Sequence, residues 1–383
     1  MIISRRKLLA SMAVLPGVML YGTASAMENP ENRFVFIILR GAMDGLTAVP
    51  PLGDSAYQSL RGALAVGKDQ TLRLDADFGL HQNLSGLHQL YTDEQMIAFQ
   101  AISSPYRERS HFDGQDVLEN GGTKPLQMND GWLSRALGSM PGANGLAVGQ
   151  SVPLVLRGGG DVTSWVPSTP SDPEDETIER LLQLYQEDPV LQEALEKSIE
   201  TDQMIGGAAR GNVNNSAVAA KAIGSLMSAP EGPRIAVMEI GGWDTHNRQG
   251  VIKGRLPNKL SELDRAITAL KKALGEVWQT SAVLVATEFG RTAKPNGSLG
   301  TDHGTGGAGF LLGGAVAGGR VVSNWPGLGA SQLYQARDLK PTMSWHSVFK
   351  AVLSDHLGVS KAALDADIFP QSSTVMASKG LIM

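Results

Sequence analysis

Acidic and imidazole side chains recur together in three short motifs of the chain. Asp244 and His246 lie in the motif GGWDTH, and Glu288 lies in TEFGR. Asp302 and His303 stand side by side in GTDHG. Carboxylates neutralise the charge of a divalent ion, and a neutral imidazole contributes a directional nitrogen ligand. We therefore expect these motifs to bind a metal ion. Because the chain has no cysteine, its ligands must be oxygen and nitrogen atoms, which suits zinc, manganese, magnesium or calcium.

A fourth motif, RSHFDGQD, contains the candidate nucleophile, Ser110. A serine hydroxyl is a weak nucleophile until a base or a metal ion lowers its pKa. His111 points away from Ser110 if the segment is extended, so activation by a metal ion is the better mechanism. Ser110 also precedes a segment, 113–118, that has the character of a helix, and a serine in this position is a typical helix N-cap. The two roles of Ser110 are compatible.

Structural interpretations stand beside the metal-binding ones. Asp44, in the motif RGAMDG, is either a metal ligand or a turn residue. Asp244 and His246 are either ligands or a hydrogen-bonded loop pair, and we favour ligands because both directly follow a buried strand. Asp302 and His303, between glycines, are either functional residues or part of a turn, and we favour function. Arg291 either binds an anion or pairs with Glu288. His346 and His356 lie in a C-terminal helical region near apolar residues, and we interpret them as structural.

Short apolar runs bounded by loop residues predict strands buried on both faces of a sheet. The predicted strands are 34–39, 96–102, 152–156, 235–240, 282–286 and 310–312. Between the fourth and fifth, apolar residues from Leu256 to Val277 recur at spacings of three and four, which predicts a helix packed on a sheet. A strand, a helix and a strand in this order form a right-handed parallel crossover unit. The pattern therefore predicts an α/β fold, a three-layer sandwich with a mostly parallel central sheet, in which chemistry collects at the carboxyl ends of the strands.

The rest of the chain is expected to belong to the same domain. Residues 160–230 have an acidic, proline-rich start and a polar helical pattern, which we interpret as a helical excursion from the sheet. The domain then spans 27–383. Its 42% hydrophobic and 19% charged residues are typical of a globular protein with a sizeable core, and no run in it is long enough to span a membrane.

The first 26 residues have the features of an export signal. Arg5 and Arg6 precede a mildly apolar stretch, and the small residues up to Ala26 suit cleavage after that residue. An ordinary secretory signal is the alternative, but the paired arginines favour the twin-arginine (Tat) route, with the Tat translocase as a partner and the periplasm as the destination. The whole chain carries a formal charge of −5, and removal of this basic signal makes it more acidic. Such a balance argues against a nucleic-acid partner.

These motifs together resemble the alkaline phosphatase and sulfatase superfamily. The stretch from VMEIGGWDTH through AVLVATEFGR to DHGTGGAGFLLGG is similar to its C-terminal half, and SSPYRERSHFDGQDVLENG is similar to the segment with the nucleophile. The chain is identified as a member of a Tat-exported bacterial family within it, catalogued as domain of unknown function fifteen-hundred-and-one. The resemblance implies an alkaline-phosphatase-like fold and a first metal site made of Asp244, His246 and His303. It also implies that Ser110 is the nucleophile.

One departure from the superfamily pattern bears on the number of metal ions. The superfamily has Asp-His after the later strand, whereas this chain has Glu288 and Phe289. Phenylalanine cannot bind metal, so the resemblance supports one site and leaves the second in doubt. Glu288, Asp302 and Asp44 are the further candidate ligands. Asp44 lies four residues later than the superfamily's first acid, and Arg40 is closer to that position.

Two functions from different classes follow. The first is an exported metal-dependent hydrolase of small phosphate or sulfate esters, in which Arg291, Arg109 and His111 hold the anionic group. The second is a non-catalytic periplasmic binding or assembly protein with a degenerate metal site, which the loss of the imidazole at Phe289 favours.

Overall fold

The computed structural model describes residues 32–166, 175–186, 188–205 and 215–383. The predicted export signal lies outside these residues. The strands are β1 Arg33–Leu39, β2 Thr71–Arg73, β3 Gly79–His81, β4 Met96–Ser103, β5 Gly145–Val148, β6 Val162–Trp165, β7 Ile235–Ile240, β8 Ser281–Thr287, β9 Gly307–Leu312, β10 Arg320–Val322 and β11 Met343–Ser344. The α-helices are α1 Gly45–Ala48, α2 Tyr57–Arg61, α3 Ser85–Thr92, α4 His111–Asn120, α5 Trp132–Gly138, α6 Asp175–Leu184, α7 Pro189–Ile205, α8 Ser216–Met227, α9 Arg255–Leu274, α10 Trp345–Ala351 and α11 Lys361–Ala363. Short 3₁₀ segments are η1 Gly62–Leu64, η2 Lys68–Gln70, η3 Leu154–Leu156 and η4 Gly275–Thr280, and short π segments are η5 Val352–His356 and η6 Leu364–Ile368.

A central sheet of nine strands organises the described residues. Its order is β10-β4-β9-β8-β1-β7-β5-β6, with β11 pairing beside the end of β4. The pairs β1–β7, β1–β8, β5–β7, β5–β6 and β10–β4 are parallel, whereas β9 runs antiparallel to both β4 and β8. The predicted mostly parallel α/β sheet is therefore confirmed. Because β9 alone is reversed in this part of the sheet, its first residue lies at the same edge as the carboxyl ends of β4, β8, β1 and β7.

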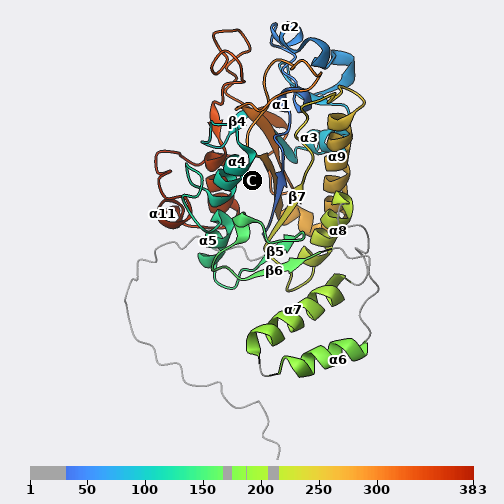
Figure 1. Cartoon of the computed structure of the whole chain (residues 1–383), viewed down its shortest axis with the longest axis vertical. Coiled ribbons are helices and arrows are strands. Elements are labelled where there is room, and N and C mark those ends of the chain that lie inside the picture. The colour runs from blue at the N-terminus through green and yellow to red at the C-terminus, as the bar shows by residue number, and fades with distance from the viewer. Residues whose placement is uncertain (1–31, 167–174, 187, 206–214) are drawn as a thin grey trace, which may run out of the picture.

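Helices cover both faces of the sheet, as Figure 1 shows, so the three-layer arrangement is also confirmed. The residues of β1 alternate between the two layers, because successive side chains of a strand point to opposite faces. Val35, Ile37 and Leu39 pack with α3, α8 and α9, and Phe34 and Phe36 pack with α5 and α10. A strand with apolar residues at every position is thus the sequence that this sandwich requires.

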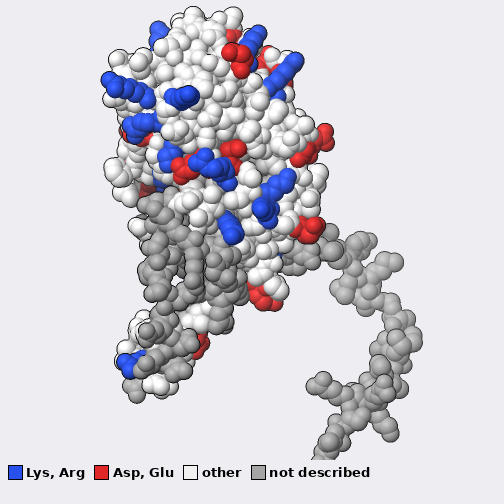
Figure 2. Space-filling view, turned by 90° about the vertical axis from the view of Figure 1, so that its right-hand side faces the viewer, with Lys and Arg blue, Asp and Glu red and all other residues white. Residues whose placement is uncertain are grey.

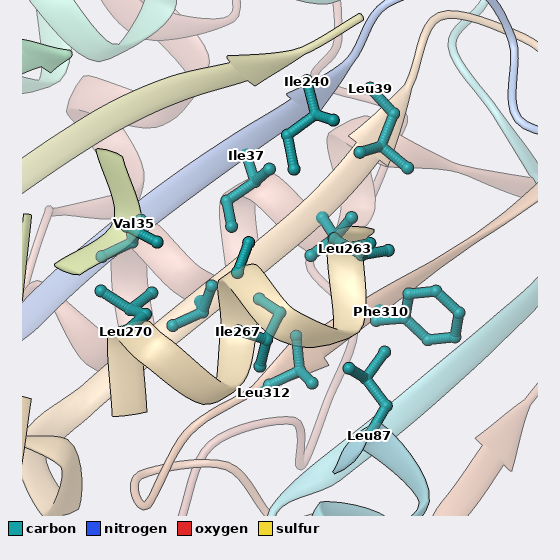
Figure 3. Close-up of a cluster of buried hydrophobic side chains, with 14 of the residues drawn as sticks. Val35, Ile37, Leu39, Leu87, Ile240, Leu263, Ile267, Leu270, Phe310 and Leu312 are labelled. Carbon is teal, nitrogen blue, oxygen red and sulfur yellow. The ribbon is translucent and has the colours of Figure 1, made fainter. Parts of the chain in front are cut away.

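The predicted apolar stripe of α9 forms one side of the larger core cluster. Figure 3 shows Leu263, Ile267 and Leu270 of this helix facing Val35 and Ile37 of β1. These side chains are fully or almost fully buried. Burial of each such side chain contributes about 1.5–3 kcal/mol to folding. These contacts hold α9 against the face of the sheet formed by β1, β7 and β8.

The strand predicted over 152–156 is wrong. Residues 154–156 form the 3₁₀ segment η3, and the strand that pairs with β7 is β5, which lies earlier in the chain. Pro153 explains the difference, because proline has no N–H to donate to a sheet ladder and is disfavoured inside a central strand. The apolar residues Val155 and Leu156 are nevertheless buried, since η3 packs in the core.

The range expected to be a helical excursion begins with a strand. β6 pairs with β5 at the edge of the sheet, and the helices α6 and α7 follow it. In Figure 1, α6 and α7 extend below the sheet, away from the layers that cover it. Figure 2, which views the face formed by α8 and α9, shows basic and acidic side chains interspersed over that face. In the described parts of the chain, no helix has both the length and the apolar character that a membrane crossing requires.

Two buried histidines in the C-terminal region predict a loss of stability in acid. Burial lowers the pKa of His346 to about 4, helped by the charge of Lys350. Burial also lowers the pKa of His356 to about 4, although its ring donates to the carbonyl of Arg33. The unfolded chain binds these protons near pH 6.5, so the stabilising contribution of each neutral ring is fully present above that pH. It falls by about 3 kcal/mol per ring as the pH drops towards 4.

Chemical denaturation at pH 7.5 and 4.5 measures this effect, and His346→Leu isolates it from the titration of the carboxyl groups. The free energy of unfolding of the leucine variant should fall by about 2.5 kcal/mol less than that of the parent protein over the same interval. An equal fall in the two proteins would show that His346 does not resist protonation in the folded state.

Candidate metal centre

Segments far apart in the sequence bring their motifs to one edge of the sheet. Asp244 and His246 follow β7, and Glu288 follows β8. His111 begins α4, after the carboxyl end of β4. His303 precedes β9, which starts at this same edge because it is antiparallel to its neighbours. The topology of the sheet therefore explains how these side chains come together.

Glycines allow the loops at this edge to touch through their backbones. Gly41 has φ of +117°, and a Cβ on it would lie 2.6 Å from the backbone nitrogen of Asp244. A Cβ on Gly290 would lie 1.8 Å from the carbonyl oxygen of Gly306. The second approach accompanies a backbone bridge between Arg291 and His303. A side chain at either glycine would thus separate the loops that position the site.

Three imidazole rings converge on one carboxylate oxygen, Oδ1 of Asp244. The Nε2 atoms of His246, His303 and His111 lie 3.0, 3.3 and 3.4 Å from it. The Nε2 atoms of His246 and His303 are 2.9 Å apart. We call these four residues the metal-candidate cluster.

The other nitrogen of each ring faces an acceptor. Nδ1 of His111 lies 2.7 Å from Glu288 Oε1, and Nδ1 of His246 lies 3.1 Å from Asp302 Oδ1. Nδ1 of His303 lies 2.8 Å from the backbone oxygen of Arg109. We assign the proton to Nδ1 in all three rings, because carboxylates and carbonyls only accept hydrogen bonds. In the neutral rings, every Nε2 lone pair then points towards the same space, and such partners on the far nitrogen are typical of metal-binding histidines.

Three of the four cluster residues, without His246, form a group that could hold a metal ion, and a second observation concerns His111. Ligand atoms of His111, Asp244 and His303 all lie within 4.8 Å of one another. A tetrahedral ion with bonds of about 2.0–2.1 Å separates its ligand atoms by about 3.3 Å, and the distances around Asp244 Oδ1 lie close to that value. In addition, Nε2 of His111 is buried without a hydrogen-bond partner among the described residues. A lone pair aimed at a carboxylate is unfavourable unless a metal ion or a proton lies between them, and the neighbouring carboxylates do raise the pKa of His111.

Charges around the cluster shift several pKa values. Burial alone disfavours the ionised carboxyl of Asp244, but the hydrogen bond and charge of Arg291 hold its pKa below the ordinary value. Burial likewise opposes ionisation of Glu288, and hydrogen bonds from His111 and other donors lower its pKa. Burial, together with the neighbouring positive charges, lowers the pKa of His303. Both carboxylates are therefore ionised at neutral pH and His303 favours its neutral form, which are the protonation states that bind metal. Burial opposes protonation of His111, but the hydrogen bonds and charges of Glu288 and Asp244 raise its pKa, so an ion that binds His111 must displace a proton.

The ring of His111 lies beside Phe289, the residue that stands where the superfamily sequence has an imidazole. The His111 ring stacks on Phe289, with the ring centroids 5.0 Å apart and the planes at 24°. Phe289 is buried and also contacts the ring of His303. The sequence predicts a substrate-binding role for His111 and, for an extended segment, a side chain that points away from Ser110. The segment is instead the first turn of α4, which directs His111 into the cluster.

The structure groups some of the predicted residues and separates others. Asp244, His246 and His303 lie together, and Glu288 and Asp302 contact the far sides of two rings. Asp44 is not brought to the cluster: it is buried, caps α1 and pairs with Arg61.

The side chains of the three remaining predicted residues make hydrogen bonds of their own, and that of Arg291 bonds a cluster residue. Ser110 is half-buried and caps α4, with its Oγ 3.5 Å from the backbone nitrogen of Asp113. The guanidinium of Arg109 bonds Asp338 and Gln335. The guanidinium of Arg291 is buried against Asp244.

Sequence reasoning did not select Arg337, which lies beside the cluster. It donates a hydrogen bond of 2.9 Å to the backbone oxygen of His303, and 42% of its side chain is exposed. A separate cavity of about 540 Å³ lies at the ends of β5 and β7, and none of the four cluster residues lines it. Its charged lining residues include Arg40, Glu239 and Lys259.

The chain belongs to the family described as Protein of unknown function (DUF1501), whose model matches residues 94–366. The match includes His111, Asp244, His246 and His303, but not Asp44. No curated protein sequence matches the chain.

Several solved structures are similar to this chain at low identity. Ps i-CgsB in complex with k-i-k-neocarrahexaose has 10% identity and a TM-score of 0.45, and the match covers 91% of this chain and 74% of that one. The C-terminal periplasmic domain of EcEptC from Escherichia coli, in complex with Zn, has 12% identity and a TM-score of 0.41, covering 94% and 93%. Phosphonate monoester hydrolase of Agrobacterium radiobacter has 9% identity and a TM-score of 0.41, covering 86% and 74%.

Proposed function

We propose that this chain is an exported, metal-dependent hydrolase of phosphate or sulfate esters. The observation that supports the proposal most directly is the convergence of three Nε2 atoms on Asp244 Oδ1, with every Nδ1 atom occupied by an acceptor. Three nitrogens and one carboxylate suit Zn²⁺ better than Mg²⁺ or Ca²⁺, which prefer oxygen ligands. Residues 1–26 would direct the chain through the Tat route to the periplasm.

Within this proposal, His111, His246, His303 and Asp244 hold the ion. When bound, such an ion polarises the ester and lowers the pKa of a nearby hydroxyl group. Glu288 and Asp302 keep two of the rings in orientation through their Nδ1 atoms.

Ser110 is the proposed nucleophile and Arg337 the proposed anion-binding residue. Ser110 lies between Arg109, whose carbonyl bonds His303, and His111. Its Oγ would form a bond to phosphorus or sulfur as the bond to the ester oxygen breaks, and water would later release the group. Arg337 takes the substrate-binding role in place of Arg109 and Arg291, because 42% of its side chain is exposed, against 20% for Arg109 and 0% for Arg291. It lies beside His303, and its Nη1 is 3.6 Å from Asp338 Oδ1, a looser contact than the carboxylate bonds of the other two arginines.

Replacing Ser110 tests the assignment of the nucleophile. We expect Ser110→Ala to lower kcat for aryl phosphate or aryl sulfate hydrolysis by about 100-fold or more, with the zinc content unchanged, because covalent catalysis is lost while the ligands remain. The protein is exported in its native host or reconstituted with Zn²⁺, and its metal content is measured before each assay.

Ser360→Ala is the matched control, because Ser360 caps α11 as Ser110 caps α4. The control variant loses a helix cap without touching the cluster and should keep the parent kcat. If Ser110→Ala hydrolyses the esters as fast as the parent protein, Ser110 is not the nucleophile. If the parent protein retains metal but hydrolyses no ester, the non-catalytic binding or assembly role is the better explanation.

A further inference from the structure

The guanidinium of Arg291 is buried against Asp244, one of the four residues of the metal-candidate cluster. None of the Arg291 side chain is exposed. Its Nη1 donates to Asp244 Oδ1 at 2.6 Å, its Nε donates to Thr301 Oγ1 at 3.2 Å, and its Nη2 donates to the carbonyl oxygen of Thr301. The guanidinium thus binds protein oxygens in three directions, so its charge acts on Asp244.

A buried chain of hydrogen bonds orients this arginine. Thr301 Oγ1 lies 2.9 Å from Gln249 Oε1, and Gln249 Nε2 lies 2.7 Å from Asp44 Oδ2. Asp44 is an acceptor only, so it fixes the amide of Gln249 with its NH₂ towards Asp44. The amide oxygen then receives the proton of Thr301, and a lone pair of that hydroxyl is left for Arg291 Nε.

The net charge of the groups around the cluster determines how many divalent ions can bind there before positive charge accumulates. Three carboxylates contact the converging rings, namely those of Asp244, Glu288 and Asp302. With neutral imidazoles, Arg291, whose guanidinium bonds Asp244 directly, leaves a charge of minus two among these groups. Outside these contacts, Arg109 and Arg337 share the carboxylate of Asp338. One divalent ion cancels the charge of minus two, and a second ion would add uncompensated positive charge next to a buried guanidinium.

We infer that Arg291 is a built-in cation that limits the centre to one divalent ion, and that Asp44, Gln249 and Thr301 hold it in place. This inference rests on the proposed metal centre. It assigns a role to Asp44 that differs from metal binding. Three oxygen atoms surround the guanidinium, namely Asp244 Oδ1, Thr301 Oγ1 and the Thr301 carbonyl oxygen. If the guanidinium were removed, these oxygens would line a cavity that could bind a metal ion.

Metal stoichiometry tests the inference without any activity assay. The full chain and two variants are dialysed against excess Zn²⁺, and bound zinc is counted by native mass spectrometry and elemental analysis. We expect one ion in the parent protein and one in Arg291→Lys, which keeps the positive charge. In Arg291→Ala we expect two ions, and addition of guanidinium ion should return this variant to one.

The outcomes separate the two proposals. A parent protein that binds no zinc refutes the metal centre itself. Two ions in the parent protein, or a single ion in Arg291→Ala that guanidinium does not affect, overturn the role of Arg291 while leaving the centre intact. If Arg291→Ala does not fold, the counts in the parent protein and in Arg291→Lys still decide, because two ions in either would contradict the inference.

Discussion

His303→Ala is expected to weaken zinc binding by about 100-fold or more and to abolish ester hydrolysis. The ring of His303 is at the centre of the cluster, because its Nε2 lies 2.9 Å from that of His246 and 3.3 Å from Asp244 Oδ1. Its removal takes away one proposed ligand and leaves a gap between the others. The affinity is measured by competition with a zinc chelator of known strength at fixed pH.

His88→Ala is a matched control for this variant. His88 lies on α3, and its Nε2 bonds a backbone carbonyl, that of Arg73, at 2.9 Å. The control variant loses an imidazole and one hydrogen bond to a carbonyl, as His303→Ala does, but it does not alter the cluster. If His303→Ala binds zinc as tightly as the parent protein does, and circular dichroism shows that the variant is folded, His303 is not a ligand.

Most of the fold could be predicted from the sequence because buried parallel strands are apolar at every position. β1, β4, β7, β8 and β9 all coincide with predicted runs, and the stripe of α9 lies against β1. β5 and β6 were not predicted, because they are only four residues long and lie near the edge of the sheet. The signal from Pro153 could have excluded the wrong strand at 152–156.

That the acidic and imidazole motifs lie at the same edge of the central sheet could be predicted only in part. Asp244, His246 and Glu288 follow parallel strands, so their common edge follows from the strand direction. The place of His303 depends on the reversal of β9, and no local feature of the sequence specifies the direction of a strand. The place of His111 in the cluster could not be predicted, because the direction of its side chain differs between an extended segment and the first turn of a helix.

The roles of Arg291 and Asp44 required contacts between segments that are distant in the sequence. Arg291 bonds Asp244, which is 47 residues away, and Gln249 bonds Asp44 across 205 residues. An acid in a glycine-rich loop is compatible with a turn, a ligand or a buried ion pair, and only the position of Arg61 decides between them. The sequence therefore predicted which residues are chemically unusual better than it predicted what each of them contacts.

Asp44→Ala is expected to destabilise the protein by about 3–5 kcal/mol, because it leaves a buried arginine without its counter-ion. Asp44 and Arg61 have side chains that are 1% and 0% exposed. The charge of Arg61 and hydrogen bonds from Gln249 and Thr47 hold the pKa of Asp44 below its usual value, although burial opposes this. Urea denaturation at neutral pH measures the loss.

The double variant Asp44→Ala, Arg61→Met separates the loss of the ion pair from the cost of an unpaired charge. Replacing both partners by apolar side chains removes the uncompensated cation, so the double variant should recover a large part of the stability that Asp44→Ala loses. A loss below about 1 kcal/mol in Asp44→Ala would show that Arg61 finds water or another acceptor instead. In the double variant, Gln249 has lost its acceptor Asp44. If that variant is stable, its zinc stoichiometry shows whether the hydrogen bonds that run from Asp44 through Gln249 and Thr301 are needed to hold Arg291 against Asp244.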